Sequence, residues 1–459
     1  MTRAIAILSS ASGGGAGIAA KRLCDGLNST GKYQANFVDV NLVGESIPPT
    51  VCLPGNLSNH KHTNTHFTAE HQGFVRGWLI DLLSKFELIN VHWASYLVSV
   101  SELQELAQRG MKILFTMHDF YYSTGGCHYP AGCTGQTLSC RTCPQVNIAD
   151  FDHTSVATAF RAKQKLLNLP NVHVSAPSRF VVESVERAGL IPTDRGHVIR
   201  NIYEPLATGF STKQASKQKL LLIADSLSEK RKGMELALAA LHLVSTQNKV
   251  PVEIHVVGNA TDEFKKAFKD HGLSPVFHGR IEKHAALVDI YRDVGLMLTC
   301  SYEDNWPNIL VEAGSYGVIP IVGSGHGCEE FCRHFSIGKV VDSYTPDAFA
   351  NAISAQIEAF PSDDELSSFS DAVRTEHATE TIVDTYEAIL SIMDENTTQT
   401  GAFAVPRESN RVSENYLGRM RRPTGRQSHF EPCETGPFSD QAVNLSQYGL
   451  RVLTEAPSE

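Results

Sequence analysis

The sequence lacks the excess of positive charge that a general binder of nucleic acid carries. Its 459 residues hold 40 lysines and arginines against 50 aspartates and glutamates, a formal net charge of −10. Binding to a phosphate backbone depends on cations that release counterions, and this balance does not supply them. We therefore expect no nucleic-acid partner.

Long apolar runs are also missing. No window approaches the roughly 20 apolar residues that cross a bilayer. The N-terminal stretch TRAIAILSSASGGG has one early arginine and a short apolar run before its glycines. That run is too short for a signal peptide and fits a first, buried parallel strand. We expect a cytoplasmic protein, and any membrane contact would be peripheral, at the inner face.

Two common nucleotide-binding motifs are absent. Gly13, Gly14, Gly15 and Gly17 stand between the first predicted strand and a helix, but their spacing is not GxGxxG and no GKS or GKT follows. Neither a standard dinucleotide site nor a P-loop is supported. Gly14, Gly15 and Gly17 either let backbone N–H groups meet an anion or an acceptor, or form a tight strand-to-helix turn.

The composition that is present indicates a globular protein of two domains. Hydrophobic residues make up 42% of the chain and charged residues 20%, and the length exceeds that of one ordinary domain. Apolar runs alternate with helical patterns from 4–8 to 197–202, and again from 219–225 to 318–324. This alternation predicts an α/β fold with two doubly wound, Rossmann-like halves that face a cleft.

The same alternation sets the expected boundaries. We assign residues 1–203 to a first domain, the polar stretch 204–218 to a linker, and 219–395 to a second domain that ends in helices. Residues 396–459 lack periodicity and carry Gly, Pro, Ser and Thr throughout, so a mostly disordered tail is expected. Its arginine-rich stretch is interpreted as solvated, with acidic lipid as the alternative.

A histidine and an aspartate end a predicted strand in the first half. The carboxyl ends of parallel strands face the ligand crevice of an open sheet. His118 there could bond a sugar hydroxyl or a phosphate, with Asp119 orienting it. The alternative is a structural pair. His92, at the end of the preceding strand, is a weaker candidate that a hydrogen-bonded core histidine also explains.

Cations cluster where the second half begins its first helix. Lys230, Arg231 and Lys232 precede the helix predicted from Gly233. Positive charge at a helix N-terminus suits a diphosphate, whose charge grows as a glycosidic bond breaks. A solvated basic turn is the alternative.

The stretch CSYEDNWPNILVEAGSYG is the most informative. Glu303 and Asp304 follow an apolar strand, and Pro307 can begin a helix. Exposed N–H groups at that helix start could hold phosphate oxygens, and a carboxylate further along could accept hydrogen bonds from ribose hydroxyls. An ordinary helix start with acidic first-turn residues is the alternative. The candidate donor-binding residues in this stretch are Asn308, Ile309, Leu310 and Glu312.

With these residues in place, the chain resembles the family 4 glycosyltransferases of GT-B fold, in the branch that includes colanic-acid and other exopolysaccharide transferases. The resemblance covers about residues 3–393. It rests on SGGGAG, MHDFYYSTGGCHY, C-x2-C-P-Q, RKG and EDNWPNILVEAGSYG. It implies retaining transfer of a hexose from a UDP- or GDP-sugar to a saccharide or lipid-linked acceptor. It also implies that residues 1–203 form the acceptor domain and residues 219–395 the donor domain. It also implies that no metal is needed for transfer.

The chain departs from the family pattern at two places. In the family's E-x7-E pair the second acid matches Glu312, but the first falls on Asp304, with Glu303 adjacent. Which of these two carboxylates meets the donor sugar stays open. Arg231 and Lys232 represent the family's Arg and Lys pair, although a serine, Ser226, occupies the usual arginine position. The single D-x-D, at 150–152, is interpreted as a helix cap.

Four cysteines are concentrated in GGCHYPAGCTGQTLSCRTCPQ. Their C-x5-C-x6-C-x2-C spacing could close a structural zinc site over the cleft. Disulfides in an oxidising compartment and buried free thiols are the alternatives. The four are Cys127, Cys133, Cys140 and Cys143.

The sequence leaves two alternatives to a transferase and one possible membrane contact. A sugar-nucleotide epimerase would bind the same donor without an acceptor, and a non-catalytic protein would bind it without turnover. The predicted helix 73–87 carries an apolar stripe of Phe74, Trp78, Leu82 and Phe86. That stripe either packs on a sheet or contacts lipid near a lipid-linked acceptor.

Overall fold

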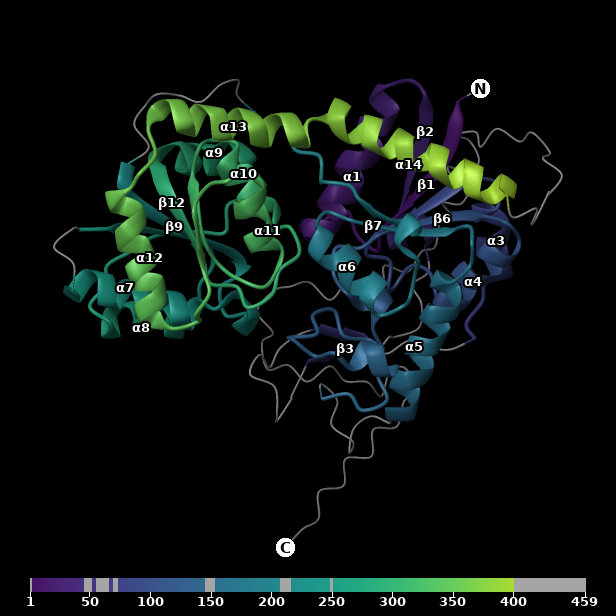
Figure 1. Cartoon of the computed structure of the whole chain (residues 1–459), viewed down its shortest axis with the longest axis horizontal. Helices are drawn as coiled ribbons and strands as arrows, with labels where there is room; N and C mark the ends of the chain where they lie inside the picture. The colour runs from purple at the N-terminus through teal and green to yellow at the C-terminus, as the bar shows by residue number, and fades with distance from the viewer. Residues whose placement is uncertain are drawn as a thin grey trace, which may run out of the picture.

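The computed structural model describes residues 2–44, 52–54, 66–68, 73–144, 153–206, 216–247 and 251–399. Within them the chain forms two six-stranded sheets, each wrapped by helices, and a two-stranded ribbon (Figure 1). Every strand pairing in the two large sheets is parallel. The α/β prediction is therefore confirmed.

The first sheet has the order β2-β1-β5-β6-β7-β8. Its strands are short and apolar, and β1, β5 and β7 are buried along most or all of their length, as parallel strands covered on both faces are. The strands are β1 (Arg3–Leu8), β2 (Tyr33–Val38), β5 (Leu88–Val91), β6 (Lys112–Thr116), β7 (Val172–Ala176) and β8 (Gly196–Val198). The helices are α1 (Gly14–Ser29), α2 (Val40–Val43), α3 (Gly77–Leu83), α4 (Val100–Gln108), α5 (His153–Leu167) and α6 (Arg179–Arg187).

The second sheet repeats the pattern with the order β11-β10-β9-β12-β13-β14. Its strands are β9 (Ser216–Ser226), β10 (Glu253–Asn259), β11 (Val276–Gly279), β12 (Val294–Thr299), β13 (Ile319–Gly323) and β14 (Lys339–Val341). The helices are α7 (Met234–Gln247), α8 (Asp262–Asp270), α9 (His284–Asp293), α10 (Asn308–Gly314), α11 (Gly327–His334) and α12 (Pro346–Glu358). The ribbon joins β3 (Cys52–Pro54) to β4 (His66–Thr68).

The last two helices link the halves. Helix α13 (Asp363–His377) lies along the second half, and α14 (Thr379–Gln399) lies along the first, beside α1 (Figure 1). Tyr386 and Ile382 of α14 share a core cluster with Ile5 of β1. The first core is therefore completed by residues almost 400 positions from the strand they cover. Helix α14 continues to Gln399, so the predicted end of the helices at residue 395 and start of the tail at 396 are four residues too early. The expected tail from residue 400 to 459 lies outside the described residues.

The apolar stripe at 73–87 is divided by the structure. Leu82 and Phe86 are each 4% exposed and belong to the core, whereas Trp78 is 39% exposed. Helix α3 covers only Gly77–Leu83, shorter than the predicted 73–87. The core interpretation therefore holds for the C-terminal half of the stripe. Within the part of the chain that the structure describes, no helix is long and apolar enough to cross a membrane.

The two sheet orders position the site. In each sheet the first strand is followed by one or more strands added on one side and then by strands added on the other. The strand order therefore reverses between β1 and β5 in the first sheet and between β9 and β12 in the second. Open parallel sheets bind ligands at the carboxyl ends of strands at such a switch point. The candidate residues at 92, 118, 231 and 304 all follow strands at or beside these points.

Candidate active site

Two cations from the loop after β9 meet one carboxylate from the loop after β12. Lys232 Nζ lies 2.7 Å and Arg231 Nη1 3.2 Å from the same oxygen, Oδ2 of Asp304. Arg231 also donates to the Glu303 carbonyl at 2.8 Å. Burial alone would raise the pKa of Asp304, but Lys232 and Arg231 outweigh burial and hold it well below its usual range. Asp304 is therefore the ionised counter-ion of both cations.

The neighbouring acid, Glu303, behaves differently. Its Oε2 accepts a hydrogen bond at 2.7 Å from the backbone N–H of Ala131, which belongs to the first half. Burial raises the pKa of Glu303 to about 7, because its single backbone hydrogen bond and the Arg231 charge offset burial only in part. The surroundings of the two adjacent acids thus shift their pKa values in opposite directions, upward for Glu303 and downward for Asp304.

Two glycines allow the backbone to close around this pair. Gly233, at φ +65°, follows the short 3-10 turn Lys230–Lys232, and an added Cβ would stand 2.0 Å from the Cys300 carbonyl oxygen. At Gly327 an added Cβ would stand 1.1 Å from the Asn305 carbonyl oxygen. Any side chain at either position would push the two loops apart.

Helix α10 follows directly and meets the first half. Asn308 Nδ2 donates to the Gly15 carbonyl at 3.4 Å, and its Oδ1 accepts from Asn201 at 2.8 Å. The backbone N–H of Leu310 is bonded to the Pro307 carbonyl at 2.9 Å, inside the first turn. Of the three predicted phosphate-binding amides, those of Asn308 and Ile309 therefore remain as candidates.

Glu312 sits deeper on α10, between the halves. Its Oε2 accepts from Tyr291 Oη at 3.3 Å, and its Oε1 lies 3.6 Å from Arg22 Nη2 of α1. Burial raises its pKa, while Arg22 and Tyr291 lower it only in part. A ribose would have to share this carboxylate with Arg22. No sequence signal marked Arg22, which is one of two adjacent basic residues on an ordinary helix.

The glycine loop before α1 is built as a turn. An added Cβ at Gly17 would stand 2.4 Å from the Ala11 carbonyl oxygen, so the chain's own backbone requires glycine there. Gly14 has φ +68°, with open space around it, and Gly15 faces Asn308. The tight-turn interpretation therefore explains Gly17, and Gly15 is the glycine of this loop that faces α10.

His118 and Asp119 do not pair with each other. His118 Nε2 lies 2.8 Å from His92 Nδ1, and the two rings stack with centroids 5.1 Å apart. Asp119 Oδ2 instead lies 2.7 Å from His128 Nδ1, and its Oδ1 accepts from the Tyr121 N–H. The prediction that Asp119 orients His118 is corrected in favour of His92, because the loop after β6 turns Asp119 toward its own residues.

A loop of the first half reaches the cations of the second. Tyr129 places its ring 3.8 Å from the guanidinium carbon of Arg231, and Ala131 is the residue bonded to Glu303. The base of this loop is held by Lys163, which is 1% exposed and donates to the carbonyls of Tyr121 and Thr124 at 2.7 and 3.2 Å. Tyr129 was missed as a site residue, although it lies in the motif MHDFYYSTGGCHY.

The four cysteines of this loop line one small cavity, together with Phe67 and Val156. All four are thiols that form no disulfide among the described residues. Burial raises the pKa of Cys127 and of Cys140, which disfavours the thiolates that bind zinc. Among the described residues, no group of three or more His, Cys, Asp or Glu side chains could hold a metal ion. The predicted structural zinc at Cys127, Cys133, Cys140 and Cys143 is therefore not supported. The D-x-D at 150–152 lies outside the described residues.

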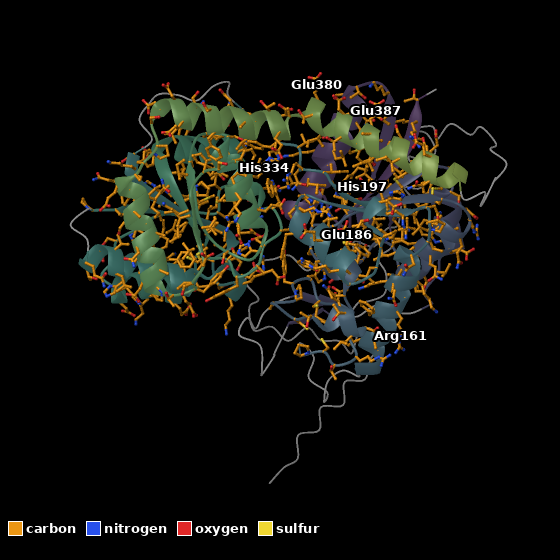
Figure 2. All side chains as sticks on the ribbon, in the orientation of Figure 1. Arg161, Glu186, His197, His334, Glu380 and Glu387 are labelled. Carbon is orange, nitrogen blue, oxygen red and sulfur yellow. The ribbon has the colours of Figure 1, made fainter. Side chains whose placement is uncertain are left out.

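Further contacts close the border between the halves. Asn305 Nδ2 donates to the Met117 carbonyl at 2.9 Å, and its Oδ1 accepts from the Ser178 hydroxyl. Glu330 accepts from the first two N–H groups of α6, both at 2.9 Å. His334 of α11, which pairs with Glu376 of α13, lies near this border (Figure 2). In the described residues the two halves are therefore in direct contact beside the site.

Comparison with known proteins agrees with this fold. Residues 208–368 match the family described as glycosyl transferases group 1. The chain is 22% identical over 275 residues to WcaC of Escherichia coli (strain K12), named as a colanic acid biosynthesis glycosyl transferase. That match covers 56% of this chain and 63% of WcaC, so the chain spans less than two thirds of that relative's length.

Solved structures cover more of the chain. HepE (Alr3699) of Anabaena, crystallised with UDP, has a TM-score of 0.56 at 15% identity, over 85% of this chain and all of that one. A glycosyltransferase of Rickettsia africae ESF-5 has a TM-score of 0.56 at 14% identity, over 86% of this chain and 98% of that one. Sucrose-phosphate synthase of Thermosynechococcus elongatus has a TM-score of 0.52 at 17% identity, over 87% and 99%. The GT-B fold is thereby confirmed.

Proposed function

We propose that the chain is a group 1 glycosyl transferase, the family that its residues 208–368 match, and that it transfers a hexose, with retention, from a nucleoside diphosphate-sugar to a saccharide or lipid-linked acceptor. The observation that carries the proposal is the meeting of Arg231 and Lys232 with Asp304 at the switch point of the second sheet. Paired cations beside a switch point suit a diphosphate, whose leaving-group charge they neutralise.

UDP is the nucleotide we propose first. Structures of HepE hold UDP and UDP-glucose, and HepE shares this fold. The donor lies between α10 and the loop after β9, in the half assigned to residues 219–395, and the acceptor lies toward residues 1–203. In the proposal, the Glu312 carboxylate accepts hydrogen bonds from the ribose hydroxyls, and the backbone N–H groups of Asn308 and Ile309 donate hydrogen bonds to phosphate oxygens.

Of the two acids left open by the sequence, Glu303 is the one we assign to the donor sugar. Asp304 is already the counter-ion of two cations, whereas Glu303 makes one backbone hydrogen bond. A carboxyl group with a pKa of about 7 can donate or accept a hydrogen bond at neutral pH. The chain would act at the cytoplasmic face of a membrane if its acceptor is lipid-linked, in polysaccharide synthesis.

A donor screen tests the proposal. Thermal shifts are measured with UDP-, GDP- and ADP-sugars on the wild type and on Lys232→Ala and Glu312→Ala. We expect one donor class to stabilise the wild type and both variants to lose that shift and turnover. Unchanged donor binding and turnover in both variants would refute the site. Product analysis with donor alone separates a transferase from an epimerase, which would convert the donor without an acceptor.

A further inference from the structure

A chain of hydrogen bonds connects His118 to the backbone of β6 through buried side chains. It begins at Asn90 of β5, which is fully buried and whose Nδ2 donates to the Leu114 carbonyl at 2.9 Å. A carbonyl oxygen only accepts, so the amide group of Asn90 has one possible orientation. Its nitrogen faces β6, and its Oδ1 must act as an acceptor on the other side.

The second bond of Asn90 agrees with this orientation. Nδ2 also lies 2.8 Å from Thr116 Oγ1, which in turn lies 3.0 Å from Ser175 Oγ. The Ser175 hydroxyl donates to the Phe115 carbonyl at 3.2 Å, so it accepts from Thr116. The Thr116 oxygen is then left to accept from Asn90. The hydrogen-bond partners thus assign one position to each side-chain proton shared among Asn90, Thr116 and Ser175.

The orientation of Asn90 fixes the proton on His92. His92 Nε2 lies 3.2 Å from Asn90 Oδ1, so that nitrogen carries the hydrogen. Burial, with His118 beside it, lowers the pKa of His92 well below its usual value, and the ring is neutral. A neutral imidazole has one N–H, and Nδ1 of His92 is therefore an acceptor.

The same step repeats at His118. Its Nε2 lies 2.8 Å from His92 Nδ1 and must donate to it. Burial lowers the pKa of His118 to about 4, with Asp119 opposing the shift, so this ring is neutral as well. The proton is on Nε2, and Nδ1 of His118 is left with its lone pair.

We infer that Asn90 and His92 are positioning residues that hold His118 in its Nε2–H tautomer, so that Nδ1 accepts a hydrogen bond from a substrate hydroxyl. His118 is half-buried and follows Met117, whose carbonyl is bonded to Asn305, two residues from Glu303. A nitrogen lone pair repels a phosphate oxygen and binds a hydroxyl. The chain of hydrogen bonds from Asn90 through His92 therefore assigns His118 to a sugar hydroxyl and not to the diphosphate. This role of His118 rests on the proposed function.

The tautomer is measured without reference to activity. The full chain is labelled with 15N-histidine, and long-range 1H–15N correlation spectra separate protonated from bare ring nitrogens. Comparison with His118→Gln identifies the His118 signals. We expect a bare Nδ1 and a protonated Nε2 at pH 7. A protonated Nδ1 with a bare Nε2, or a ring protonated on both nitrogens, would overturn the inference even if the transferase activity is established.

Kinetics of His92→Phe test the consequence. Phenylalanine keeps an aromatic ring but cannot accept the proton of His118. We expect kcat to fall by about tenfold, which is what one lost hydrogen bond is worth, while the donor KM stays within about twofold. Asn90→Leu should act in the same direction. An unchanged kcat in a folded His92→Phe overturns the positioning role, and the spectrum of the wild type decides the tautomer if both variants fail to fold.

The chain offers a matched control. His255 of β10 and His278 of β11 stack in the same way, with centroids 5.2 Å apart and a 3.0 Å contact between Nδ1 and Nε2. Neither belongs to the site. His255→Phe should leave kcat and both KM values unchanged. A loss equal to that of His92→Phe would show that a general effect of breaking a histidine stack explains the result, and the inference would fall.

Discussion

Replacing Asp304 by asparagine removes the counter-ion of two cations at once. The change keeps the shape of the side chain and deletes its charge. Lys232 and Arg231 are 18% and 7% exposed at their side chains, so water replaces the lost partner only in part. Removing one partner of a buried ion pair costs about 3–5 kcal/mol.

The expected loss is smaller here, because other groups remain. Arg231 keeps Glu229 at 2.8 Å and the Glu303 carbonyl, and Lys232 has some access to water. We therefore expect Asp304→Asn to lower the free energy of unfolding by about 2 kcal/mol. For a domain of this size that corresponds to a fall in Tm of roughly 4–8 °C.

UDP should reverse part of the loss. In the wild type a diphosphate shares its two cations with Asp304, and like charges face each other. In Asp304→Asn the diphosphate has the cations to itself and should bind more tightly. At a concentration of 100 Kd a ligand stabilises by about 2.7 kcal/mol, and the shift grows as Kd falls. We expect the UDP-induced rise in Tm to be larger in the variant, measured by differential scanning calorimetry.

Asp293 provides the control. It pairs with Lys219 at the same distance, 2.7 Å, but its side chain is 51% exposed and lies away from the site. An exposed pair contributes less than about 1 kcal/mol. Asp293→Asn should therefore change stability little and leave the UDP response as in the wild type. A UDP-induced shift that is smaller in Asp304→Asn than in the wild type would refute the assignment of the two cations to the diphosphate.

Three further outcomes are expected. Folding raises the pKa of Glu303 from 4.5 to about 7, so the folded wild type loses stability as pH rises from about 4.5 to 7. Glu303→Gln removes this loss. In urea unfolding, the free energy of unfolding of the variant relative to the wild type should therefore increase by about 2–3 kcal/mol between pH 4.5 and pH 8. A gain independent of pH would contradict the burial argument. Gly327→Ala should cost about 3 kcal/mol or more by overpacking against Asn305, while Gly13→Ala, which meets nothing within 4 Å, should be near neutral; equal denaturation midpoints would contradict the steric argument. Transfer should keep its full rate in EDTA because Arg231 and Lys232 supply the positive charge, and a rate lost in EDTA and restored by Mn²⁺ would refute that mechanism.

The local pattern of the sequence determined the elements. Buried parallel strands are continuous apolar runs, and helices carry a 3.6-residue period, so both are visible along the chain. The predicted apolar runs agree with strands of the structure to within a few residues, as 4–8 does with β1 and 318–324 with β13. The strand ends at His118 and Asp304 marked the site, because parallel strands direct their carboxyl ends to one edge.

Tertiary structure alone decided the partners. Asp119 and His118 are adjacent in sequence, yet one bonds His128 and the other His92, since strand β5 lies beside β6 only after folding. Likewise, Asp304 became the counter-ion and Glu303 the raised acid because of Lys232 and Ala131, which lie 72 and 172 residues away. Sequence patterns report local periodicity, whereas charge and proton positions depend on neighbours that the sheet order brings together.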